Sequence, residues 1–274
     1  MLSALALLPL LLPGQEGTRP NVLLIIVDDL NDRVGALGGH PQARTPNIDA
    51  LAARGVVFTN AHCQAPVCTP SRASLFTGRL PSTTGMYFLQ PALAQARELD
   101  GVTTLVERFA ADGYDTLGVG KLYHGSREAR FFQEYGGGMG GFGPSPPKKL
   151  SYPQGHPLWN WGPYPETDAL MPDSKVADWA IAKLGEERDE PFFLAVGFWR
   201  PHVPMCVPEP WFKAIGRAED VRLPDVLATD RDDLPRYATE LTIGIPAPRH
   251  EWMVEHDAWR GAVHAYLASS SFAP

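Results

Sequence analysis

Two short apolar runs constrain the fold of this chain more than any other feature of its 274 residues. One covers residues 21–27 and contains Val-Leu-Leu-Ile-Ile-Val, and the other covers residues 191–198. Uninterrupted apolar runs of this length, rich in β-branched or aromatic side chains, are typical of strands that are buried on both faces. Such strands belong to parallel sheets covered by helices, and residues 116–120 form a shorter run of the same kind.

Helical patterns alternate with these strands along the chain. They lie at residues 45–52, 103–110, 173–184 and 259–267, and each of the first two is followed by a glycine that ends it. A further strand is expected at residues 56–61, and residues 135–172 are expected to form a long loop with little regular structure. The alternation predicts an α/β fold with a mainly parallel central sheet flanked by helices.

Charge and cysteine content exclude two classes of protein. The formal net charge of −7 argues against nucleic acid as a partner, because binding to a phosphate backbone relies on clustered Lys and Arg. Three cysteines, Cys63, Cys68 and Cys206, cannot all pair within one chain, so this is not a disulfide scaffold. An anionic substrate would have to be met by local positive charges.

The first residues have the character of an export signal. Residues 2–12 are apolar but too short to span a bilayer, and a Pro-Gly segment follows them. We therefore expect residues 1–18 to be a signal peptide with a short linker, and residues 19–274 to be one domain of an exported protein. The alternative for residues 2–12 is a short buried helix.

A cysteine precedes a predicted helix in the middle of the first half. Pro70 and Ser71 mark the helix start and Gly78 its end, which places Cys68 just before the N-terminus. The exposed N–H groups and dipole of a helix N-terminus stabilise an anion, and Arg72 adds a positive charge one turn on. The segment is suited to a reactive sulfur or a bound oxyanion; the alternative is a buried free cysteine beside a surface arginine.

Other chemically capable residues follow the predicted strands. Asp28 and Asp29 come directly after the first strand, and adjacent carboxylates can begin a site for Ca²⁺ or Mg²⁺, which take oxygen ligands. Lys121 and His124 follow the strand at residues 116–120, and His202 follows the strand at 191–198. In open parallel sheets the ligand site lies beyond the carboxyl ends of the strands. Each residue alone also fits a turn, a cap or a solvated charge.

Several of these segments together resemble the sulfatase family of the alkaline-phosphatase-like superfamily. Residues 68–72, Cys-Thr-Pro-Ser-Arg, are similar to its Cys-x-Pro-Ser-Arg signature, and residues 113–124 resemble its second signature, which ends in a Lys and a nearby His. Residues 27–29 resemble its first metal-binding pair, and residues 200–204 its segment with a further substrate-side His. The combination is most similar to the iduronate-2-sulfatase-like branch.

The resemblance implies a reaction and its machinery. Cys68 would be oxidised to formylglycine by a formylglycine-generating enzyme, and the hydrated aldehyde would attack the sulfur of a sulfated sugar. Asp28, Asp29 and Cys68 would hold Ca²⁺ or Mg²⁺. The substrate-side residues implied are Arg72, Lys121, His124 and His202. A phosphate or phosphonate ester hydrolase of the same superfamily, using Cys68 directly, is a second interpretation.

One element of the family pattern is missing from the sequence. Sulfatases complete the metal site with Asp followed by His or Asn at the end of a later strand, and no such dipeptide occurs here. Residues 259–269 resemble the helix before that strand. We therefore expect the chain to be an N-terminal portion of a sulfatase, and a remnant that at most binds sulfated glycans is the non-enzymatic alternative.

Overall fold

The centre of the molecule is a four-stranded, all-parallel sheet with the order β1-β5-β2-β3. A computed structural model describes residues 19–124, 130–152, 156–243 and 247–273. The strands are β1 (Val22–Val27), β5 (Phe192–Phe198), β2 (Asp115–Gly120) and the short β3 (Glu134–Tyr135). The α/β class with a parallel sheet is confirmed, and the three longer strands lie where the apolar runs predict them.

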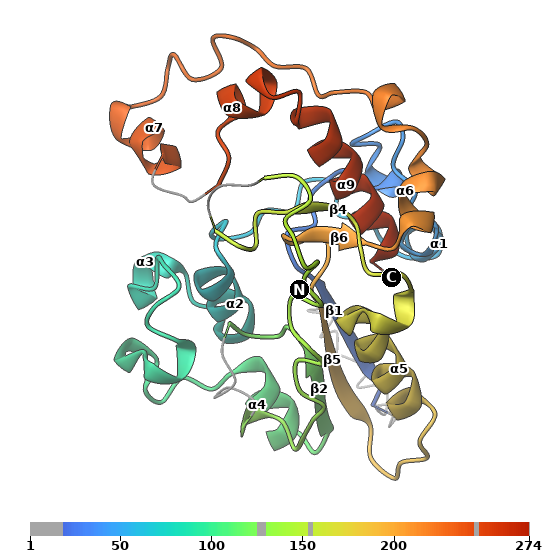
Figure 1. Cartoon of the computed structure of the whole chain (residues 1–274). Helices are drawn as coiled ribbons and strands as arrows, with labels where there is room; N and C mark the ends of the chain where they lie inside the picture. The colour runs from blue at the N-terminus through green and yellow to red at the C-terminus, as the bar shows by residue number, and fades with distance from the viewer. Residues whose placement is uncertain (1–18, 125–129, 153–155, 244–246, 274) are drawn as a thin grey trace, which may run out of the picture.

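Helices cover both faces of this sheet (Figure 1). On one face, α5 (Pro172–Leu184) packs Val176 and Ala180 against side chains of β2 and β5. On the other face, α2 (Cys68–Thr77) and α4 (Leu105–Ala111) contribute Phe76 and Val106 to a second apolar cluster. Burial of apolar side chains on both sides explains why the central strands contain so few polar residues.

A second, smaller layer lies beyond the carboxyl ends of the central strands, as Figure 1 shows. Here β4 (Trp161–Pro163) pairs in parallel with β6 (Met205–Val207), and α6 (Glu209–Ile215) and α9 (Trp259–Phe272) pack against this pair. Their shared core contains Trp161, Met205, Phe212 and Leu267.

The remaining helices are short. They are α1 (Pro46–Ala52), α3 (Pro81–Thr84), α7 (Arg236–Ile243) and α8 (His250–Glu255), with 3-10 turns at Gly35–Leu37, Leu93–Gln95, Arg97–Leu99, Asp168–Leu170 and Ala218–Asp220. Within the described ranges, no helix has both the length and the hydropathy required to cross a bilayer. The predicted signal peptide lies outside the described residues.

The strand predicted at residues 56–61 is wrong. In the structure this segment is an irregular stretch, and Val56 and Phe58 are 83% and 78% exposed. Residues that favour strands form one only where a neighbouring strand supplies hydrogen bonds. In the described part of the chain no strand pairs with residues 56–61. The same sheet ends at β1, where Leu23 and Ile25 are 44% and 46% exposed.

Candidate functional site

Strand register brings the ends of β1 and β2 to the same edge of the sheet. Val27 pairs with Phe198, and Gly120 pairs with Gly197, so Asp28 and Lys121 both follow the last paired residue of their strand. A Cβ on Gly197 would lie 2.2 Å from the carbonyl oxygen of Lys121, so only glycine lets the two backbones approach this closely. The register of the strands thus places a carboxylate and an ammonium beside each other.

Asp28 is buried and carries two cationic partners. Its Oδ1 accepts a hydrogen bond from Arg72 Nη2 at 2.7 Å, and its Oδ2 accepts one from Lys121 Nζ. Burial acts to raise the pKa of Asp28, but the charges and hydrogen bonds of Lys121 and Arg72 outweigh it and hold this pKa below its ordinary value. The carboxylate is therefore ionised at neutral pH.

Cys68 lies at the start of α2 and faces the same group. The helix begins at Cys68 itself, two residues before the predicted start at Pro70, and its C-cap is Gly78 with φ of 67°. Lys121 Nζ lies 3.6 Å from Cys68 Sγ. An open cavity of about 370 Å³, lined by the end of β1, residues 63–67 and the first turn of α2, lies beside the thiol.

Arg72 is buried and bonded to protein groups, whereas a group that contacts substrate is expected to face the cavity. Its Nη1 donates to the carbonyl of Lys121 and its Nη2 to Asp28. Arg72 is 5% exposed. It therefore holds the ends of two strands together and fixes the Asp28 carboxylate.

The loop after β5 delivers His202. The carboxylate of Asp173, at the start of α5, accepts the backbone N–H groups of Trp199 (2.7 Å) and Arg200 (3.0 Å). His202 Nδ1 lies 2.6 Å from the carbonyl of Val203, which can only accept, so Nδ1 carries the proton. In the neutral ring the lone pair is then on Nε2, which lies 3.7 Å from Asp29 Oδ2.

Three of these side chains converge to a distance suited to a common cation. Ligand atoms of Asp28, Cys68 and His202 all lie within 4.8 Å of one another. Asp29 lies beside His202, with its side chain 56% exposed, and is not a member of that cluster. The donor set fits a divalent cation, but it is one oxygen, one sulfur and one nitrogen atom, whereas Ca²⁺ and Mg²⁺ prefer oxygen ligands.

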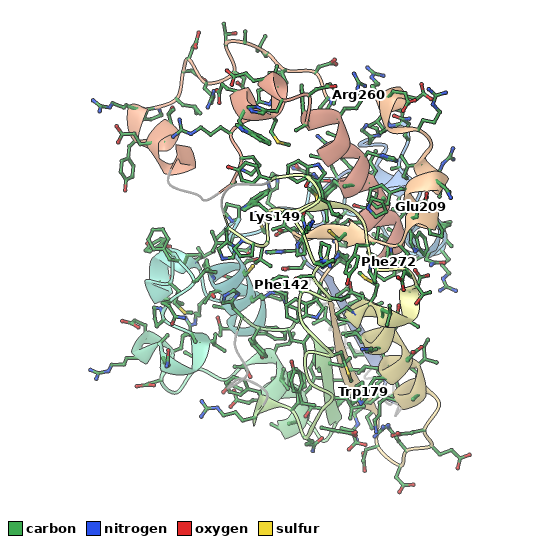
Figure 2. All side chains as sticks on the ribbon, viewed as in Figure 1. Phe142, Lys149, Trp179, Glu209, Arg260 and Phe272 are labelled. Carbon is green, nitrogen blue, oxygen red and sulfur yellow. The ribbon has the colours of Figure 1, made fainter. Side chains whose placement is uncertain are left out.

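Aromatic side chains enclose Lys121, and the sequence patterns did not identify them. Its Nζ lies 4.7 Å from the ring centroid of Phe142 and 5.3 Å from that of Trp199. Phe142 lies between α2 and the central strands in the view of Figure 2, and its carbonyl accepts a hydrogen bond of 2.8 Å from the buried Arg200. A cation held near aromatic faces gains electrostatic stabilisation. Phe142 belongs to a glycine-rich loop whose path has no local sequence signal.

Helix α9 also reaches the site, through Tyr266. The Tyr266 hydroxyl donates to the carbonyl of Asp29 at 2.8 Å and accepts from the N–H of Asn31 at 2.9 Å. Asp29 has a φ of 60°, which non-glycine residues rarely adopt. Burial raises the pKa of Tyr266 to about 12, so the hydroxyl stays protonated and keeps both bonds. Nothing in the local sequence connects residues this far apart.

The structure does not bring the predicted site residue His124 to the cluster of Asp28, Cys68 and His202. His124 is exposed, after the end of β2, and lines a separate cavity of about 60 Å³ together with Thr69 and Ala73 of α2. The cysteines of the described chain are all free. Cys63 is exposed and lines the cavity beside Cys68, whereas burial raises the pKa of the Cys206 thiol to about 11.

Comparisons with known proteins agree on one family. The family model described as "Sulfatase" matches residues 20–239. A sulfatase of Formosa agariphila is 38% identical, in a match that covers 94% of this chain and 54% of the relative. Human iduronate 2-sulfatase is 34% identical, over 76% of this chain and 40% of the relative. The chain thus spans about half the length, or less, of these relatives.

Solved structures share the fold. A phosphonate monoester hydrolase of Agrobacterium radiobacter superposes with a TM-score of 0.67 at 22% identity, covering 93% of this chain and 57% of that one. A putative sulfatase from Bacteroides thetaiotaomicron superposes with a TM-score of 0.59 at 25% identity, covering 92% and 52%. The central sheet and its flanking helices are therefore a known arrangement.

Proposed function

Because the chain belongs to the sulfatase family, we propose that the protein to which it belongs hydrolyses sulfate esters of a sulfated carbohydrate, in the manner of an iduronate-2-sulfatase. The observation that supports this most is the convergence of Cys68, Lys121 and Asp28 at the carboxyl edge of the parallel sheet. The proposal concerns the whole protein, since the chain spans about half the length of its relatives.

Each residue has a role in this proposal that follows from its position. Formylglycine formed from Cys68 supplies the nucleophile, a hydroxyl of its hydrated aldehyde. The unmodified thiol has no such hydroxyl. Lys121, 3.6 Å from Cys68 Sγ, places a positive charge where the non-bridging oxygens of a sulfate would lie. Arg72 keeps the carboxylate of Asp28 oriented, and His202 is placed to exchange a proton with the substrate.

Asp28 is the protein ligand for Ca²⁺ or Mg²⁺ in this proposal, with Asp29 beside it. Such cations polarise the oxygens of a bound ester and take six or more oxygen ligands. The described residues supply fewer, so water, the sulfate and a further segment of the whole protein complete the set. Sulfur at position 68 is a poor ligand for these ions, and an oxygen there after modification is a good one.

A peptide of the chain tests the nucleophile directly. Trypsin cleaves after Arg54 and Arg72, and the peptide between them contains both Cys63 and Cys68, so Cys63 is an internal control. After expression with a formylglycine-generating enzyme, fragmentation mass spectrometry should find the aldehyde at position 68 alone. Finding only unmodified cysteine there would sink the proposal.

Substrate class is tested with a panel of sulfate, phosphate and phosphonate monoesters. The whole, modified protein should hydrolyse sulfated sugars, and Cys68→Ala should abolish the activity. Preference for phosphorus esters would replace the proposed reaction with the second interpretation, and no hydrolysis at all would favour a glycan-binding remnant. Export, which we propose from residues 2–12, predicts a mature N-terminus near Arg19 in secreted material.

A further inference from the structure

Asp28, Cys68 and His202 form a donor set that differs from the one expected of the modified enzyme. Their ligand atoms lie within 4.8 Å of one another and supply one carboxylate oxygen, one sulfur and one imidazole nitrogen. Zn²⁺ is bound by thiolate, imidazole and carboxylate ligands, usually four in number, and three protein ligands with one water are a common set. We propose that the chain with unmodified Cys68 binds Zn²⁺ through Asp28, Cys68 and His202.

The protein already holds a positive charge between two of these donors. Lys121 Nζ donates to Asp28 Oδ2 and lies 3.6 Å from Cys68 Sγ. An ammonium in this position shows that the surroundings favour a cation there, and Zn²⁺ competes with it. The rings of Phe142 and Trp199 lie 4.7 and 5.3 Å from Nζ while it is bonded to Asp28, so aromatic faces that can stabilise an ammonium are close to the position it would leave.

The third donor, His202, is oriented by a hydrogen bond to the neighbouring backbone carbonyl. Since Nδ1 of His202 donates to the carbonyl of Val203 at 2.6 Å, its Nε2 presents a lone pair. A second bond of this kind on a ligating histidine fixes the ring orientation and raises its basicity. Asp28 is fixed in the same way by Arg72 at 2.7 Å.

Binding exchanges one cation for another at Asp28. The thiol of Cys68 releases its proton to solvent, Lys121 leaves Asp28 Oδ2, and Zn²⁺ takes its place between that carboxylate and the Cys68 thiolate, while the hydrogen bond from Arg72 to Asp28 Oδ1 remains. The cavity of about 370 Å³ beside Cys68 leaves room for a water as fourth ligand. Conversion of Cys68 to formylglycine would replace this sulfur ligand with oxygen. The statement about formylglycine rests on the proposed function, whereas Zn²⁺ binding by the unmodified chain does not.

Cobalt reports on the sulfur ligand, because Co²⁺ bound to thiolate gives an intense charge-transfer band in the near ultraviolet. The chain, produced without a modifying enzyme and freed of metal, should show this band at one Co²⁺ per chain, and Zn²⁺ should displace it, since Zn²⁺ binds more tightly. Cys68→Ser should abolish the band. Cys63→Ser is the matched control: Cys63 lines the same cavity and is exposed, and its loss should leave the band unchanged.

Three further variants test the other ligands. His202→Ala and Asp28→Asn should each weaken Co²⁺ binding by about tenfold or more. Lys121→Met should strengthen it, because the competing ammonium is gone. Absence of the band in the unmodified chain, its persistence in Cys68→Ser or its loss in Cys63→Ser would each overturn the proposal.

Alkylation gives a readout that needs no variant. Zn²⁺ should slow the reaction of iodoacetamide with Cys68 and leave Cys63 unchanged, as measured on the peptide of residues 55–72. Equal rates at Cys68 with and without Zn²⁺ would contradict the proposal. Neither assay uses a substrate or the modified residue, so both outcomes are independent of whether the whole protein is a sulfatase.

Discussion

Asp173 should stabilise the site through two backbone hydrogen bonds, and its removal gives a measurable loss of stability. The side chain is 2% exposed and accepts the N–H groups of Trp199 and Arg200 at 2.7 and 3.0 Å. Each buried donor left without a partner costs about 1–3 kcal/mol. Burial raises the pKa of Asp173, because a charged carboxylate is less stable away from water. This cost of ionisation offsets part of the stability that the two hydrogen bonds contribute. We expect Asp173→Ala to lower the free energy of unfolding by about 3 kcal/mol.

Asp173→Asn should be milder, because the amide keeps one acceptor oxygen while losing the charge. We expect a loss of about 1 kcal/mol for this variant. Asp178, exposed on the same helix α5, provides the matched control, and Asp178→Ala should change the free energy of unfolding by less than about 0.5 kcal/mol.

Urea unfolding followed by tryptophan fluorescence and by circular dichroism measures all three variants, with coincident transitions as the check for two-state behaviour. Because Asp173 anchors the loop that delivers His202, Asp173→Ala should also weaken Co²⁺ binding while Asp178→Ala should not. Equal stability of Asp173→Ala and Asp178→Ala would refute the reasoning, since the two bonds would then contribute nothing.

Two other predictions concern the turn after β1. Tyr266→Phe removes the hydrogen bonds to Asp29 and Asn31, so hydrogen exchange at the Asn31 amide should accelerate. Tyr237→Phe, at an exposed position, is the control and should leave that exchange unchanged. The same exchange rate at Asn31 in both variants would contradict the role of the Tyr266 hydroxyl. The cations beside Asp28 lower its pKa in the folded state from 3.8, so its contribution to stability is present above about pH 4 and is lost as pH falls through the lower value. The destabilisation by Asp28→Asn should therefore shrink on acidification from pH 7, and a pH-independent difference would exclude this mechanism.

The sequence determined the elements whose own residues carry a strong pattern. The apolar runs at Val22–Val27 and Phe192–Phe198 predicted strands, and β1 and β5 formed there, although β1 is an edge strand in which Leu23 and Ile25 are 44% and 46% exposed. The capping pair Thr104 and Glu107 likewise fixed the start of α4, because its hydrogen bonds are local. Where an element depends on its own residues, its position follows from them.

Segments whose state depends on a partner could not be predicted in the same way. Residues 56–61 have strand propensity but no strand beside them in the described chain, so they stay irregular and exposed. Sequence order placed His124 beside Lys121, yet only Lys121 reaches Cys68. Lys121 follows the strand end and is buried, whereas His124 lies three residues further along the chain and is exposed.

The sequence by itself identified Cys68 at a helix start, and Asp28, Lys121 and His202 after strands, as chemically capable residues, because their types and their neighbours in the chain carry that information. Only the tertiary structure decided which atoms meet: register set Asp28 against Lys121, and α2 set Cys68 3.6 Å from the Lys121 ammonium. Contacts such as Tyr266 to Asp29 join residues more than two hundred positions apart. The free energy of such contacts depends on distances between packed elements, and no local pattern of residues encodes those distances.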